Sequence, residues 1–477
     1  MRHSRRSVLT ATAMGAVTLG ATATPARAAS AGPGSRPPAT AQPPGRELRA
    51  LLREIDRDRI EATVRRLVSF GTRHTLSAQD DPPPAASGRA GAVRGIGAAR
   101  DWIAAELRGY AALSEGRMTV ELQSYVQEPA SGIPTPTRIT NIVATLRGSV
   151  TPERVYVVSG HYDSRVTDLM DATSDAPGAD DDASGVAVAM ELARVLARRR
   201  PASTLVFAAV AGEEQGLYGA AHMAQLYRAA GVDVQGMFTN DIVGSSTADD
   251  GTRDPYTIRL FAEGVPTSET PAQAATRRSV GGENDSPSRQ LARFVRDVGD
   301  NDATGMRVRV VYRRDRYRRG GDHIPFLERA YPAARFTEPA EDFAHQHQDV
   351  RVDENGRQFG DLPEFCDFPF VARVTKVNAA ALWTLSQAPG TPRDARIITT
   401  VLTNSTRLVW TRGTEPDLAG YEVVWRETTA PEWTHVIPAG DVTAYEVDLS
   451  KDNVFFGVRA VSRTGARSPV AFPSPQA

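Results

Sequence analysis

Residues 154–164 read RVYVVSGHYDS, and the fold class follows from this segment and from others like it. Its apolar run from Val155 to Val158 has no polar alternation, which predicts a strand buried on both faces of a sheet. Similar runs recur along the chain, and amphipathic helical patterns separate them. This alternation predicts an α/β fold with a mainly parallel central sheet flanked by helices. The other expected strands are 141–144, 205–210, 237–243, 255–263 and 306–312, and the expected helices are 47–70, 96–113, 184–199, 217–229, 287–298 and 367–386.

The sequence pattern changes after Gln387. Residues 389–392 (PGTP) are typical of a linker, and shorter alternating runs separated by turn residues follow them. This pattern predicts a small C-terminal all-β sandwich over 392–477. Trp410, the strand at Tyr421 and the ending GVRAVSRTGARS resemble a fibronectin type III domain. We expect this domain to bind a surface or a polymer and to carry no chemistry of its own.

The N-terminus has the pattern of an export signal. Residues 1–28 combine a basic start, a mild apolar stretch and a small-x-small end at Ala26-Arg27-Ala28. The pair Arg5-Arg6 is typical of a twin-arginine signal. Residues 29–46 are rich in Pro, Ala, Ser and Gly, which predicts a flexible linker. We therefore expect a secreted protein.

Bulk composition excludes several classes of protein. Cys366 is the single cysteine, so no disulfide forms within the chain. The formal net charge of -1 gives no global field that would attract nucleic acid. No stretch after the export signal is long and apolar enough to span a bilayer. We therefore expect neither nucleic-acid binding nor membrane insertion.

Acidic and imidazole side chains follow three of the expected strands, and the acidic loop 178–185 (GADDDASG) leads into a helix. Ligands of open α/β sheets bind beyond the carboxyl ends of the strands, so these groups can converge. Their carboxylates would repel one another in a partly dry crevice, and one or two divalent cations are the simplest neutraliser. Imidazole and carboxylate ligands suit zinc. The residues concerned are His161, Asp163, Asp181, Glu213, Glu214 and Asp241.

Six segments, in this order, resemble the co-catalytic di-zinc aminopeptidase family, which is family twenty-eight of the metallopeptidases. The resemblance implies a zinc-exopeptidase fold for a catalytic domain at 47–388, two zinc ions per chain, and peptide substrates that lose residues from a free N-terminus. Each segment alone is a weak signal, since acidic loops are common, but the ordered set is specific. The segments are VVSGHYDS, PGADDDASG, GEEQGLYG, TNDIVG, GGDHIPF and AHQHQD.

The resemblance also implies a role for each site residue. One zinc would be bound by His161 and Asp241, and the other by Glu214 and His345, with Asp181 as the bridge between them. Glu213 would be the general base that takes a proton from water and passes it to the leaving amine. Asp163 would accept a hydrogen bond from the imidazole of His161 and fix its tautomer.

Two features of the last segment leave the assignment open. We expect His345 as the ligand because it stands four residues before Asp349, as in the family, and His347 is the alternative. Many family members have a tyrosine directly before this histidine, and its hydroxyl stabilises the oxyanion. Ala344 occupies that position here and cannot donate a hydrogen bond. We also expect the loop from Arg165 to Pro177 to cover the site.

Three other hypotheses come from the same residues. A dipeptidase or carboxypeptidase of the same fold would share the metal ligands, because specificity lies in the pocket walls. A single-zinc acyltransferase similar to glutaminyl cyclases would need fewer ligands, and the full set of five argues against it. A binding protein without enzymatic activity, built around the C-terminal domain, would have no need of Glu213.

Overall fold

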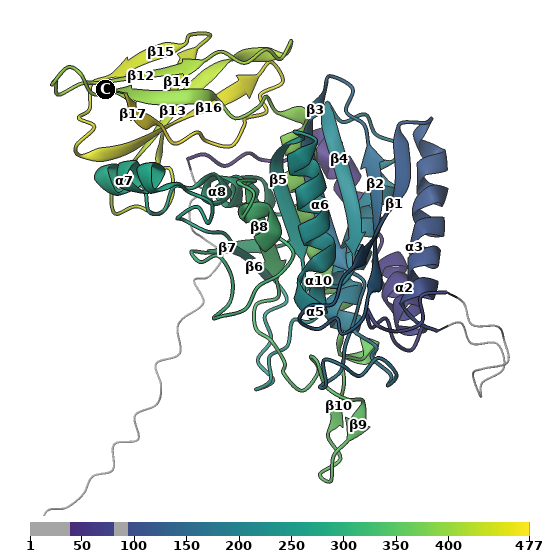
Figure 1. Ribbon diagram of the computed structural model, residues 1–477. Helices are drawn as coiled ribbons and strands as arrows, with labels where there is room; N and C mark the ends of the chain where they lie inside the picture. The colour runs from purple at the N-terminus through teal and green to yellow at the C-terminus, as the bar shows by residue number, and fades with distance from the viewer. Residues whose placement is uncertain (1–38, 81–93, 477) are drawn as a thin grey trace, which may run out of the picture. The chain divides into compact units, whose positions relative to one another are not determined.

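The computed structural model describes residues 39–80 and 94–476. The expected export signal at 1–28, and the part of the expected linker that precedes Ala39, lie outside the described residues. The first domain contains one eight-stranded sheet in the order β1-β2-β4-β3-β5-β8-β6-β7 (Figure 1). Its strands are β1 (Met118–Gln127), β2 (Thr137–Leu146), β3 (Thr151–His161), β4 (Ser203–Val210), β5 (Asp233–Asn240), β6 (Thr257–Phe261), β7 (Arg307–Val311) and β8 (Ala333–Thr337).

The sheet is parallel at its centre, and antiparallel pairs occur on both sides of this centre. Strands β4, β3, β5 and β8 are parallel neighbours, and β6 pairs with β7 in the same way. The pairs β1–β2, β2–β4 and β6–β8 are antiparallel. The predicted α/β class with a mainly parallel centre is confirmed, and the antiparallel strands make the whole sheet mixed.

Helices cover both faces of the sheet, which explains the apolar runs. Along β3, Val157 and Val158 point to opposite faces and belong to two separate hydrophobic clusters. Helices α4 and α10 pack on one face, and α6 with α9 packs on the other. The helices are α1 (Arg46–Arg53), α2 (Arg57–Val68), α3 (Ile96–Ala111), α4 (Gly185–Leu196), α5 (Glu213–Gly216), α6 (Tyr218–Ala229), α7 (Pro271–Val280), α8 (Pro287–Gly299), α9 (Ile324–Leu327) and α10 (Phe368–Gln387).

Capping side chains explain two differences from the predicted helices: one predicted helix is divided in two, and one helix was not predicted. The expected helix at 47–70 is divided into α1 and α2, because Oδ1 of Asp56 accepts hydrogen bonds from the backbone of Asp58 and Arg59 and caps α2. Helix α7, which the periodicity did not predict, buries none of its residues and begins with a capping box between Thr270 and Gln273. No helix in the part of the chain that the structure describes is long and apolar enough to cross a membrane.

The C-terminal region forms the predicted sandwich. One sheet has the order β15-β12-β11-β17 and the other β14-β13-β16. The two sheets share a core that includes Leu408 and Trp410 from the first and Tyr421 and Val458 from the second. The fibronectin type III resemblance stays a prediction. The strands are β11 (Arg393–Ile398), β12 (Thr406–Thr411), β13 (Leu418–Glu427), β14 (His435–Gly440), β15 (Ala444–Val447), β16 (Val454–Ser462) and β17 (Ser474–Gln476), and a short hairpin of β9 (Arg351–Val352) and β10 (Gln358–Phe359) precedes them.

Buried polar contacts join the sandwich to α8. The carboxylate of Asp285 lies 2.7 Å from Arg293 of the first domain and 2.7 Å from Arg426 of β13, and all three side chains are buried. Nε1 of Trp433 donates to the side chain of Gln290 at 2.9 Å. The chain around Gln42 also enters this region, earlier than the expected end of the flexible linker, and its backbone nitrogen donates to α8. The sandwich therefore packs against the first domain through charged and aromatic groups.

Candidate metal centre

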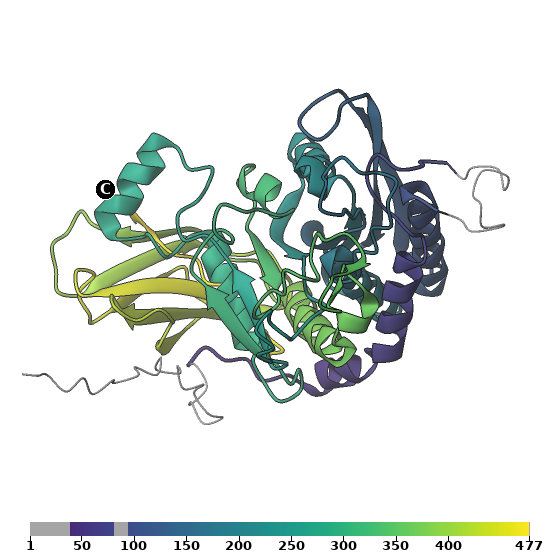
Figure 2. The ribbon, with the colours of Figure 1, turned by 90° about the horizontal axis from the view of Figure 1, so that it is seen from below.

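The sequence-predicted residues other than His345 meet at the carboxyl edge of the central strands, which is the edge next to α5 in Figure 1 and faces the viewer in Figure 2. His161 is the last residue of β3. Glu213 opens α5 shortly after β4, and Asp241 directly follows β5. Because β3, β4 and β5 are parallel neighbours, their ends bring these side chains together.

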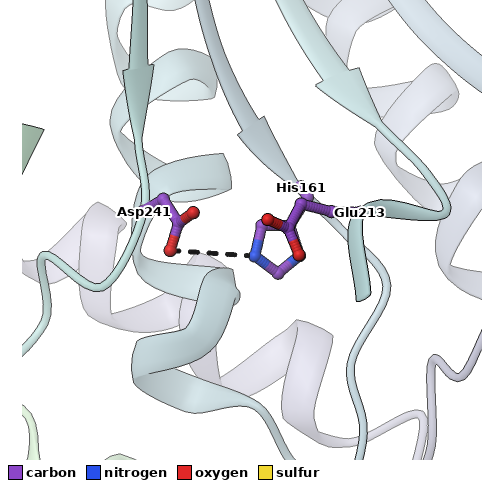
Figure 3. A group of neighbouring side chains, drawn as sticks. All are labelled: His161, Glu213 and Asp241. Atoms are coloured by element: carbon purple, nitrogen blue, oxygen red, sulfur yellow. Dashed lines mark ion pairs between the residues drawn. The ribbon is translucent and has the colours of Figure 1, made fainter. Parts of the chain in front are cut away.

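The first group consists of His161, Glu213 and Asp241, which offer one ligand atom each within 4.8 Å of one another. Figure 3 shows the ring of His161 facing the carboxylate of Asp241, and the distance from Nε2 to Oδ1 is 4.0 Å. Burial is the largest cause that raises the pKa of Glu213, and the charge of Asp241 raises it further. The group thus concentrates two carboxylates around one imidazole, with His161 and Asp241 buried.

The second group consists of Asp181, Glu214 and His347, again with ligand atoms within 4.8 Å of one another. Nε2 of His347 lies 2.8 Å from Oδ2 of Asp181 and 3.1 Å from Oε1 of Glu214. The other oxygen of Asp181, Oδ1, lies 3.0 Å from Nε2 of His161. A single carboxylate therefore faces one histidine of each group.

The structure corrects the choice between the two histidines of the last segment. His345 is outside both groups: its Nδ1 lies 2.8 Å from Asp342, its Nε2 lies 3.2 Å from the carbonyl of Gln358, and its ring stacks on Phe365. The backbone at His347 has a φ of 52°, so the chain turns there and the two rings point in different directions. The expectation that His345 is the ligand is wrong in this geometry, and His347 takes the place.

With His347 as the ligand, a different residue occupies the position at which many family members have a tyrosine. The residue directly before His347 is Gln346, not Ala344. Gln346 is buried, and its Nε2 lies 3.3 Å from Oδ2 of Asp181. Unlike alanine, a glutamine can donate hydrogen bonds, so this position does hold a donor.

Asp163 contacts one residue of each group, His161 and Glu214. Its backbone carbonyl is 3.2 Å from Nδ1 of His161, whereas its carboxylate is 3.7 Å away. The expected contact with the imidazole is therefore made mainly by the main chain. Oδ2 of Asp163 instead accepts hydrogen bonds from the backbone of Glu214 and from the hydroxyl of Thr75. Burial raises the pKa of this carboxyl group.

The acidic loop before α4 is held by residues that the sequence did not single out. Asp361 accepts from the backbone N–H groups of Asp180 and Asp181, each at 2.8 Å, so it fixes the backbone of the shared carboxylate. The buried Arg73 donates to the carbonyls of Tyr162, Pro177 and Gly178.

Asp182, the third acidic residue of the loop, has a structural position. Oδ1 of Asp182 accepts from the backbone of Gly185 at the start of α4, and Oδ2 accepts from the backbone of His161. Asp182 therefore caps the start of α4, while Asp181 faces the two histidines.

Two further buried ionisable residues, Arg335 and Asp322, belong to the surroundings of the first group. Nη2 of Arg335, a buried residue of β8, donates to Oδ1 of Asp241 at 2.7 Å. Burial lowers the pKa of Arg335, but the charges of Asp241 and Asp315 outweigh it and raise the pKa above its usual value. Asp322 is fully buried, neither of its carboxyl oxygens has a hydrogen-bond partner, and burial raises its pKa to about 8.

The donor set fits a pair of zinc ions. Nε2 of His347 and Oε1 of Glu214 are buried and make no hydrogen bond, although they lie only 3.1 Å apart. Close approach without hydrogen-bond geometry is expected of atoms that share a cation. Each group combines one imidazole with carboxylates, which is a donor set that zinc accepts.

Comparison with known proteins places the chain in a family. The model of "Peptidase family M28" matches residues 141–360. A probable zinc metalloprotease of Leptosphaeria maculans is 58% identical over 432 residues, which is 91% of this chain and 98% of that protein. A probable zinc metalloprotease of Pyricularia oryzae is 57% identical, over 91% of this chain and 86% of that protein.

Solved structures with a similar fold include two aminopeptidases. The LapA aminopeptidase of Legionella pneumophila matches 70% of this chain and 73% of its own, with a TM-score of 0.47 and 19% identity. The aminopeptidase of Aneurinibacillus sp. strain AM-1 matches 71% and 95%, with a TM-score of 0.46 and 14% identity. The family suggested by the six sequence segments is confirmed by the closely related sequences, and the chain belongs to peptidase family M28.

Proposed function

We propose that this chain is a secreted aminopeptidase that uses two zinc ions to remove residues from the free N-terminus of peptides. One observation carries the proposal: the two oxygens of Asp181 face Nε2 of His161 at 3.0 Å and Nε2 of His347 at 2.8 Å. A carboxylate between two imidazoles of separate groups suits a bridge between two cations. The names of the relatives support zinc as the metal.

Each residue of the two groups has a separate role in the proposed hydrolysis. His161 and Asp241 would hold one zinc, Glu214 and His347 the other, and Asp181 would bridge them. Zinc bound there supplies a Lewis acid and lowers the pKa of bound water. Glu213, whose pKa is raised by burial, accepts the proton of the attacking water and donates it to the leaving amine.

The neighbouring residues keep this arrangement in place. Asp361 holds the backbone on both sides of the Asp180–Asp181 peptide, and Asp163 holds the backbone of Glu214. Arg335 orients the carboxylate of Asp241. Residues fixed in this manner keep ligand atoms in position before the metal arrives, which is what an efficient metal site requires.

The specificity for the N-terminus and the secretion are supported by resemblance and by sequence pattern. The six ordered segments are similar to those of di-zinc aminopeptidases, and residues 1–28 have the features of an export signal. A carboxypeptidase or dipeptidase of the same fold would use the same metal ligands. A single-zinc acyltransferase would not need both groups of ligands.

The test is hydrolysis of matched peptides by the zinc-loaded protein. We expect release of one residue at a time from the N-terminus, detected by mass spectrometry. N-terminal acetylation should abolish cleavage, and a zinc chelator should abolish it until zinc is restored. Equal cleavage of free and acetylated peptides, or release of residues from the C-terminus, would overturn the aminopeptidase proposal.

A further inference from the structure

Arg165 contacts the second group of ligands but has no part in the reaction proposed above. Its Nη2 lies 2.8 Å from Nδ1 of His347, and its Nε lies 3.1 Å from Oε2 of Glu214. The side chain is 21% exposed, so the guanidinium lies within the site and not on the open surface. Its Nε is buried and makes no hydrogen bond.

The backbone that carries Arg165 is tied to the segment that carries His347. The backbone of Thr167 donates to the carboxylate of Asp349 at 3.2 Å, and the backbone of Asp349 donates to the hydroxyl of Thr167 at 3.2 Å. This reciprocal pair joins the start of the loop from Arg165 to Pro177 to the turn after His347. The guanidinium is therefore presented to the site by a braced backbone.

The contact between Arg165 and His347 is incompatible with metal binding by the same ring. When Nε2 of a neutral imidazole binds a cation, the ring proton resides on Nδ1. A protonated Nδ1 cannot accept the N–H of Arg165. The carboxylate of Glu214 likewise gives electron pairs to the cation. When zinc binds, the guanidinium of Arg165 therefore loses Nδ1 of His347 as an acceptor, and Glu214 becomes a weaker acceptor.

A carboxylate is the acceptor that best replaces them. Guanidinium presents a planar fork of N–H donors that matches the two oxygens of a carboxylate. The positive charge of Arg165 would lie close to that of a cation held by Glu214 and His347, and two such charges together attract an anion. The two buried arginines near the site already have partners: Arg335 is paired with Asp241 and Asp315, and Arg73 donates to three backbone carbonyls.

We propose that Arg165 binds a carboxylate of the substrate, so that the site favours peptides with a carboxylate on the residue directly after the scissile bond. The inference rests on the proposed function, because it assumes cleavage after the first residue. The carboxylate can come from two sources that share this chemistry. It is either the C-terminal α-carboxylate of a dipeptide or the side chain of an acidic second residue.

Three substrates separate the two sources: Leu-Gly, Leu-Gly-amide and Leu-Glu-amide. For the zinc-loaded full chain we expect kcat/KM for Leu-Gly or Leu-Glu-amide to exceed that for Leu-Gly-amide by roughly 10- to 100-fold, the value of a charged hydrogen bond. Preference for Leu-Gly identifies the α-carboxylate, and preference for Leu-Glu-amide identifies the side chain. In the Arg165→Gln variant the ratio of kcat/KM values should fall to about 1, which means no preference, and Arg165→Lys should retain part of the preference.

Binding provides a readout that does not depend on turnover. Calorimetric titration of the same peptides into zinc-loaded Glu213→Ala protein should show the same preference in binding affinity. The preference should disappear in the double variant that also carries Arg165→Gln. The matched control is Arg357→Gln, since Arg357 is a half-exposed arginine of the same region whose guanidinium lies 3.7 Å from the carboxylate of Asp342. This variant should retain the preference.

The results distinguish failure of the Arg165 inference from failure of the proposed function. If the wild-type protein cleaves the three peptides equally well, or if Arg165→Gln keeps the preference, the role of Arg165 is overturned while the aminopeptidase stands. If Arg165→Gln loses zinc, Arg165 supports the metal ligands and the inference is again overturned. If none of the peptides is cleaved, the proposed function fails, and the titration still decides whether Arg165 binds a carboxylate.

Discussion

Nε2 of His347 lies 2.8 Å from Oδ2 of Asp181, whereas both ring nitrogens of His345 are directed at other groups. This difference predicts unequal effects of two matched substitutions. His347→Ala should reduce the bound zinc by one equivalent per chain, measured by elemental analysis, because the second group loses its imidazole. His345→Ala should retain both equivalents. The reverse pattern would restore His345 as the ligand.

Glu213→Gln should lower kcat by about 10²- to 10⁴-fold, the usual contribution of a general base. The amide is close in size to the carboxylate but cannot take a proton from water. Zinc content should stay at the wild-type value, which separates loss of the base from loss of metal. Wild-type turnover in the zinc-loaded variant would show that another group accepts the proton.

Asp361→Asn should weaken zinc binding by about 10- to 100-fold, as expected for a residue that positions a ligand. The asparagine oxygen can accept from only one of the two N–H groups at Asp180 and Asp181, and its NH₂ group faces the other. Competition with a chelator measures the zinc affinity. An unchanged affinity would mean that the loop keeps Asp181 in place without this contact.

His323 predicts a pH dependence of stability. Burial is the main cause that lowers its pKa from 6.5 to about 4, so the folded protein keeps this ring neutral while the unfolded chain protonates it. Stability from this residue is present above pH 6.5 and is lost as the pH falls from 6.5 toward 4. The loss amounts to about 3 kcal/mol, given about 1.4 kcal/mol for each pH unit.

The matched variant is His323→Gln, which keeps a donor for the carbonyl of Arg314. Its melting temperature should fall less than that of the wild type between pH 7 and pH 4.5. A chelator is present at both pH values, so that metal release does not contribute to the difference. Equal falls in the two proteins would show that His323 does not titrate in this range.

Asp285→Asn should destabilise the protein by about 3–5 kcal/mol, because it leaves two buried arginines without their shared carboxylate. Denaturant unfolding measures the change. Asp441→Asn is the control, since the pair of Asp441 with Arg412 is about half exposed and solvent screening leaves it a small effect on stability. Similar small effects of both variants would mean that the sandwich does not depend on this contact.

The centre of the fold was predictable from sequence because its strands are apolar on both sides. The run around Val157 carries a signal that needs no knowledge of neighbours. The edge strand β1 was missed because it lacks the continuous apolar run that marks the central strands, and much of its surface is exposed. Helix α7 was missed because it has no buried face and depends on its capping box.

The site was predictable where its ligands follow strands or stand in ordered segments, as His161, Glu214 and Asp241 do. The choice of His345 failed because spacing along the chain does not reveal the turn at His347, where φ is positive. Asp361 and Arg335 left no sequence signal. Each is a single charged residue whose partner lies far along the chain, so only the folded structure brings the two together.

The most direct test of the two-metal account is the number of zinc ions that the purified full chain retains after exposure to excess zinc and removal of loosely bound metal. Two groups of ligands joined by Asp181 predict two equivalents per chain, with both lost together when Asp181 is replaced by alanine. A protein that retains one equivalent or none, under conditions where it is folded, would contradict the account.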